Sequence, residues 1–138
     1  MRAAAILAAV AVVTACGGHR APSAESVARA WSAALNRSDD QTAAKLFAPS
    51  ARVIQNGELV LRTHGDAVTW NRALPCGGRV ERVILQADDQ VLVVFRLTER
   101  PAHECDAPGQ DAAAVFRVRD GKIVLWHQTP VPEEPPAV

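Results

Sequence analysis

The hydrophobic pattern of the second half of the chain constrains its fold more than any other feature. Four segments rich in valine, isoleucine, leucine and phenylalanine follow one another, at residues 79–86, 91–99, 112–119 and 122–128. Short apolar segments bounded by turn residues are typical of β-strands. Asp88-Asp89 and Asp120-Gly121 predict tight turns within two of the strand pairs, and residues 100–110 form a longer loop. The sequence therefore predicts a sheet of consecutive antiparallel strands.

The first half follows a helical period instead. Apolar residues recur every three to four positions between Ser23 and Asn36, which predicts an amphipathic helix with Trp31 on its inner face. Residues 38–40 can cap a second helix that runs through Phe47 and that Pro49 ends.

A hairpin and a third helix complete the predicted elements. Asn56-Gly57 is a strong two-residue turn between short strands at 52–55 and 58–62. Asp66 is a candidate N-cap for a helix that continues to Leu74. Helices that precede a run of strands predict the α+β class, with the N-terminal helices packed on a curved, mainly antiparallel sheet.

The length of the chain fits a single domain, and its basic and acidic side chains balance. The chain has 138 residues, with 15 basic and 15 acidic side chains, and one core can stabilise a domain of this size. Proteins that bind nucleic acid usually concentrate basic residues on one face. We therefore expect no nucleic-acid partner.

The N-terminal segment resembles a bacterial lipoprotein signal. Arg2 precedes an apolar run over residues 3–13, and the small residues Thr14 and Ala15 lead into Cys16. The resemblance implies a signal peptide at 1–15, acylation of Cys16 with palmitate-like chains, and a lipidated linker at 16–22. An ordinary signal peptide with a free cysteine, or a short membrane span, remains an alternative, although a span needs about 20 apolar residues. We expect an exported protein, lipid-anchored on the extracytoplasmic side of the cell membrane.

The other two cysteines, Cys76 and Cys105, are expected to pair. An exported protein meets an oxidising compartment, where disulfides persist. Cys76 precedes the predicted strand 79–86 and Cys105 follows the predicted strand 91–99. If these two strands form a hairpin, both cysteines lie at the same end of the sheet. A metal pair that includes His103 is the alternative, but its ligand spacing is poor, and we predict no metal site.

The order of these elements resembles the nuclear transport factor 2-like (NTF2-like), SnoaL-like superfamily over residues 23–130. The closing hairpin 119–127 and the helix opened by His64-Gly65-Asp66 carry the resemblance. It implies a cone in which a curved sheet encloses a pocket, and dimers that form through the outer sheet face in many members. The superfamily includes isomerases, polyketide cyclases, dehydratases and binding modules, so membership alone selects no activity. Residues 131–138 are expected to form a proline-rich tail.

The final hairpin predicts which side chains face the pocket. A two-residue turn at 120–121 pairs Val118 with Ile123, Phe116 with Leu125 and Ala114 with His127 on the inner face. Arg117 with Val124 and Val115 with Trp126 would then lie outside. The candidate pocket residues share an inward position on a predicted helix or strand; they are Trp31, Gln55, Trp70, Phe116, Leu125 and His127.

His127 is the candidate catalytic residue, because an imidazole can act as acid or base near neutral pH. The superfamily's isomerases use a carboxylate on the strand after the second helix, and Gln55 or Asn56 stands there in this chain. An amide cannot accept the proton.

These observations predict a membrane-anchored domain that binds a small apolar ligand or a partner protein without catalysis. The alternative is a small cyclase, dehydratase or isomerase that uses His127 as acid or base. We expect no cofactor. Besides membrane lipid, the candidate partners are a second copy of the chain, through its outer sheet face, and an envelope protein.

Overall fold

The computed structural model describes residues 11–12, 17–18 and 20–137. Apart from residues 11–12, the predicted signal peptide lies outside these ranges, as does Cys16. None of the helices in the described ranges is both long and apolar enough to cross a membrane.

In the described part of the chain, three helices precede most of the sheet, and side-chain caps fix where they begin. Helix α1 (Ala24–Asn36) follows Ser23, whose Oγ accepts the Ser26 N–H at 3.1 Å. Helix α2 (Asp40–Lys45) is capped by Asp39. Helix α3 (His64–Ala73) starts before the predicted Asp66, because Thr63 is the N-cap and Asp66 returns the bond as the third residue of a capping box.

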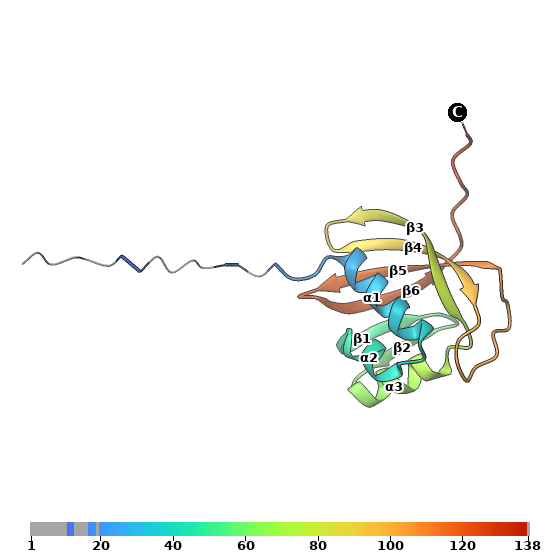
Figure 1. The fold of residues 1–138 in the computed structure, drawn as a ribbon, viewed down its shortest axis with the longest axis horizontal. Helices are drawn as coiled ribbons and strands as arrows, with labels where there is room; N and C mark the ends of the chain where they lie inside the picture. The colour runs from blue at the N-terminus through green and yellow to red at the C-terminus, as the bar shows by residue number, and fades with distance from the viewer. Residues whose placement is uncertain (1–10, 13–16, 19, 138) are drawn as a thin grey trace, which may run out of the picture.

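Within residues 20–137, six strands form one sheet in the order β2-β1-β6-β5-β4-β3. The strands are β1 (Phe47–Ile54), β2 (Glu58–Leu61), β3 (Gly77–Ala87), β4 (Gln90–Thr98), β5 (Asp111–Arg119) and β6 (Lys122–Thr129). Only β1 and β6 pair in parallel; the other neighbours are antiparallel. The helices lie against the inner face of the curved sheet (Figure 1). The α+β cone predicted from the sequence is confirmed.

The second helix and the first strand meet earlier than predicted. The chain leaves the helical conformation after Lys45, and β1 already begins at Phe47, opposite Ile123 of β6. Pro49 therefore lies within the strand. It occupies the irregular stretch between Phe47 and Arg52, where the pairing with β6 shifts register and a missing N–H is tolerated.

The predicted register of the final hairpin is wrong beyond its first pair. Val118 faces Ile123 as expected, but a bulge next to this pair shifts β6 by one residue. Phe116 then pairs with Trp126, and Val115 pairs with His127. A shift of one residue exchanges the two faces of a strand. Trp126 therefore points into the core, while His127 and Leu125 lie on the outer face.

Burial of aromatic area accounts for this shift. All six aromatic residues of the chain belong to one cluster, with ring centroids 5.0–6.4 Å apart: Trp31, Phe47, Trp70, Phe95, Phe116 and Trp126. Trp126 is only 6% exposed. In the predicted register the leucine and the histidine would have pointed inward and the tryptophan outward, which buries less apolar area.

Two buried polar side chains hold the helices in place under the sheet. Trp31 Nε1 donates to Asn71 Oδ1 at 2.8 Å, which joins α1 to α3. The Arg100 guanidinium donates to Asp40 Oδ1 at 2.7 Å and to the carbonyl oxygen of Leu74 at 2.8 Å. These bonds fix the positions of all three helices relative to one another.

Candidate functional site

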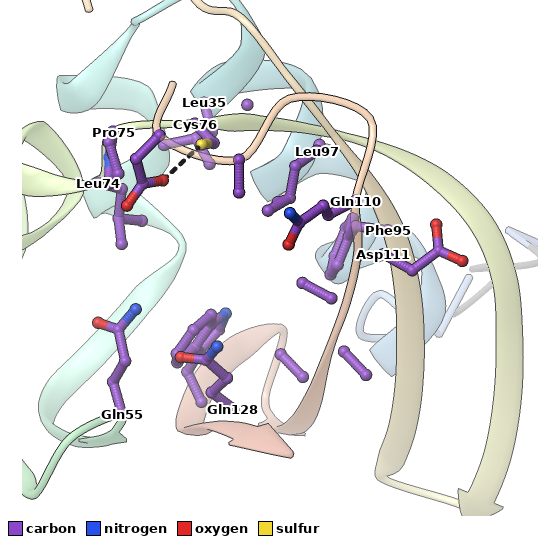
Figure 2. A pocket seen from close by; sticks show the side chains of 18 of the residues that line it. Leu35, Gln55, Leu74, Pro75, Cys76, Phe95, Leu97, Gln110, Asp111 and Gln128 are labelled. Carbon is purple, nitrogen blue, oxygen red and sulfur yellow. Dashed lines mark hydrogen bonds between the residues drawn. The ribbon is translucent and has the colours of Figure 1, made fainter. Parts of the chain in front are cut away.

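A cavity of about 360 Å³ opens at the end of the cone where β6 finishes and β5 begins. Its walls come from the C-terminal half of α1, the inner face of the sheet and the loop between β4 and β5 (Figure 2). The lining residues are Trp31, Leu35, Gln55, Leu74, Pro75, Cys76, Gly77, Gly78, Phe95, Leu97, Asp106, Ala107, Gln110, Asp111, Ala112, Ala113, Ala114, Trp126 and Gln128.

The inner wall of the cavity is apolar. Trp31 of α1, Phe95 of β4 and Trp126 of β6 form its floor, and each is at least 90% buried. Small side chains on β5, Ala112 and Ala114 among them, leave the space above this floor open. A concave apolar wall of this kind accommodates the apolar part of a small molecule.

Three exposed glutamines surround the mouth: Gln55 after β1, Gln110 before β5 and Gln128 on β6. Figure 2 shows their amide groups around the open space. Val53 lies beside Trp126 in the parallel pairing, so extending that register by two residues places Gln55 beside Gln128. Each amide offers both donors and an acceptor to a ligand.

The disulfide between Cys76 and Cys105 closes one side of the mouth. Its Cα atoms are 4.5 Å apart, and it ties the β4–β5 loop to the residue that precedes β3. Asp106 Oδ1 lies 3.4 Å from Cys76 Sγ, the contact marked by the dashed line in Figure 2. A disulfide sulfur carries no hydrogen, so this contact is not a hydrogen bond.

The same three residues are the one candidate metal group within the described parts of the chain, since their ligand atoms lie within 4.8 Å of one another. A metal binds cysteine as a thiolate. Because Cys76 and Cys105 are joined to each other, their sulfurs are not thiolates. The predicted disulfide is confirmed in the structure.

The titratable side chains among the lining residues are two aspartates at the rim, Asp106 and Asp111. Asp111 forms an ion pair with Arg96, with Oδ1 and Nε 2.7 Å apart. Within the ranges that the structure describes, the titratable groups of the lining therefore lie at the rim and not on the inner wall.

Two of the six predicted pocket residues line this cavity, namely Trp31 and Gln55. Trp70 and Phe116 belong to the aromatic core beneath it. Leu125 and His127 lie on the outer face of the sheet, because the bulge in β6 reverses their orientation. The prediction that these last two face the pocket is wrong.

Comparison with known protein families identifies the family of this chain. The family described as a SnoaL-like domain matches residues 28–126, which is most of the chain. The chain belongs to the SnoaL-like domain family. Among curated proteins, none matches it significantly.

Solved structures share the fold of this SnoaL-like domain at low sequence identity. An NTF2-like protein of unknown function from Cytophaga hutchinsonii is 11% identical, with a TM-score of 0.63 over 81% of this chain and 92% of its own. A putative polyketide cyclase from Sinorhizobium meliloti is 17% identical, with a TM-score of 0.60 over 75% and 94%. A putative ketosteroid isomerase from Kribbella flavida is 20% identical, with a TM-score of 0.57 over 81% and 82%. These likenesses establish the fold.

Sequence reasoning missed Trp126, Gln128, Gln110 and Asp106 as lining residues. The predicted register places Trp126 on the outer face, because no turn or glycine signal marks the bulge that turns Trp126 and Gln128 inward. A preference for burying the largest side chain would have favoured the observed register. The loop residues Gln110 and Asp106 follow from the disulfide, which brings the β4–β5 loop to the mouth of the SnoaL-like cone.

Proposed function

We propose that this SnoaL-like domain binds a small, largely apolar ligand in the cavity and releases it chemically unchanged. The single observation that carries the proposal is the chemistry of the inner wall. Aromatic and aliphatic side chains line it, amides surround its mouth, and its titratable groups are confined to the rim. Such a cavity can select a ligand by shape and hydrogen bonding.

The position of Gln55 supports binding over proton transfer. Gln55 lines the cavity from the end of β1, the strand on which the superfamily's isomerases place their carboxylate base. A general base must lie within hydrogen-bonding reach of the proton that it removes. An amide in this position can orient a carbonyl or hydroxyl group, but it cannot take a proton from it.

The alternative reaction with His127 as acid or base finds no support in its position. His127 pairs with Val115 and Ile54 on the outer face of the sheet. A group on that face is separated from the cavity by the sheet itself. We therefore propose the binding function alone.

Attachment to the membrane through acylated Cys16 is part of the same proposal. The support is the signal-like segment of the sequence, in which Arg2, an apolar run and two small residues lead to this cysteine. Fractionation of cells that express the wild type and the Cys16→Ser variant tests this part. We expect the wild type in the membrane fraction and the variant in the extracytoplasmic soluble fraction, and membrane retention of the variant would contradict anchoring.

Native mass spectrometry of the mature chain from an exporting host tests the binding function. We expect an additional mass that is lost on denaturation and that reappears unchanged when the extracted compound is added back. A Trp31→Ala variant should lose this mass, whereas Leu85→Ala, which removes an exposed side chain outside the lining residues, should retain it. Conversion of the returned compound into another product would refute the non-catalytic proposal.

A further inference from the structure

We propose that the ligand of this cavity is an organic cation, an amine or quaternary ammonium compound with an apolar body, whose positive charge lies against Asp106. This inference rests on the binding function proposed above and adds the chemical class of the ligand. It is carried by the charges around the cavity and by the disulfide-tethered loop that places one carboxylate at its rim.

The lining of the cavity carries two acidic side chains, and the charge of one of them, Asp106, is not balanced by a basic residue. Among the lining residues that the structure describes, none is a lysine, an arginine or a histidine. Asp111 is already paired with Arg96 at 2.7 Å. Within the described part of the chain, Asp106 has no basic group within ion-pair distance. The remaining uncompensated charge at the mouth is therefore negative, which attracts cations and repels anions.

The loop that carries Asp106 is held at the mouth by several contacts. Cys105, the preceding residue, is joined to Cys76 and donates its backbone N–H to Glu99 Oε2 at 3.0 Å. Further along the loop, the Gly109 N–H donates to the Leu97 carbonyl oxygen at 2.8 Å. The backbone of the loop that carries Asp106 is thus held at the rim before a ligand arrives, which reduces the entropy lost on binding.

The remaining walls also suit a cation with an apolar body. Trp31, Phe95 and Trp126 form the floor, where the apolar body of the ligand can pack while its charged group stays at the rim beside Asp106. The carbonyl oxygens of the glutamine amides at the mouth accept hydrogen bonds from an amine. An anionic ligand would meet no complementary positive charge among the lining residues.

Three probes on one skeleton separate charge from shape: 3-phenylpropylamine, 3-phenylpropan-1-ol and 3-phenylpropanoate. Each is titrated into the mature, disulfide-bonded chain while ¹H–¹⁵N spectra follow the backbone of residues 112–114 and the indole of Trp126. We expect the amine to bind about fivefold or more tightly than the alcohol at low ionic strength, as one unit charge pair at close range implies. The carboxylate should bind weakest, and added salt should reduce the differences.

Two charge-neutralising variants in the same loop test whether Asp106 causes the preference for the amine over the alcohol. Asp106→Asn should remove the preference for the amine over the alcohol. Glu104→Gln removes the same charge two residues away, at a side chain outside the lining, and should leave most of the preference intact. An alcohol that binds as tightly as the amine, or an unchanged preference in Asp106→Asn, would overturn the cation inference while leaving the binding function standing. If none of the three probes shifts a cavity resonance, the binding function fails together with the inference.

Discussion

Replacing Arg100 with methionine is expected to lower the free energy of unfolding by about 3–5 kcal/mol. The Arg100 side chain is completely buried, and its guanidinium makes four hydrogen bonds. They reach Asp40 Oδ1 at 2.7 Å, the carbonyl oxygens of Leu74 at 2.8 Å and Asn71 at 2.9 Å, and Ser38 Oγ at 3.1 Å. One side chain therefore joins the start of α2 to the end of α3.

The expected magnitude follows from the groups that the substitution leaves behind. Removing one partner of a buried ion pair costs about 3–5 kcal/mol, because the other charge stays buried without compensation. Asp40 keeps a second cation, Arg72 at 3.5 Å, but that side chain is 62% exposed and its attraction is weak. The two carbonyl oxygens lose their donor, at about 1–3 kcal/mol each if water cannot replace it. Burial of the methionine offsets part of this loss.

Urea unfolding of the oxidised chain, followed by tryptophan fluorescence, measures the effect. Arg100→Lys serves as the matched control, since it keeps the charge but lacks the planar fork that reaches several acceptors at once, and it should lose about half as much stability. Hydrogen exchange should accelerate most at the end of α3 and the start of α2. A loss below about 1 kcal/mol for Arg100→Met, with unchanged exchange in these helices, would refute the assignment of this residue as the tie between them.

Three further predictions concern other contacts. Asn71→Leu leaves the Trp31 N–H without its acceptor and should cost about 1–3 kcal/mol, measured by urea unfolding; no loss would contradict the role of the 2.8 Å bond. Reduction of the disulfide, which spans 29 residues, should lower the free energy of unfolding by about 3–4 kcal/mol, and an unchanged melting temperature would count against it. Hydrogen bonds from Thr42, through its side chain first and its backbone N–H second, hold the pKa of Asp39 below its ordinary value. The stabilisation from ionised Asp39 is therefore present above its unfolded pKa and is lost as the pH falls through the folded one; an Asp39→Asn chain should show less acid destabilisation, and identical pH profiles would exclude the effect.

Much of the fold could be predicted from the sequence, because local pattern and turn chemistry determine it. The four apolar segments between residues 79 and 128 form β3 to β6, with each bound within two residues of its predicted position. Asn56-Gly57 forms the turn between β1 and β2, with Gly57 at a φ of 135° that glycine adopts without strain. The disulfide could be predicted as well, because hairpin topology alone brings the ends of neighbouring strands together.

The site depended on details that no local pattern records. Helix α2 ends early because Phe47 gains a strand partner in Ile123, which lies 76 positions further along the chain. The bulge in β6 arises because Trp126 packs with rings from distant elements, among them Trp31 and Trp70. That one-residue shift turned His127 outward and brought Gln128 to the mouth of the cavity.

The sequence by itself determined the order of helices and strands, their turns and the pairing of Cys76 with Cys105. Those features depend on residues that are near in the chain, or on the topology of a single hairpin. Only the tertiary structure decided which face of β6 meets the core and which loop carboxylate stands at the cavity. Strand register is set by the total apolar area that all elements bury together, so it becomes defined only when the whole domain has packed.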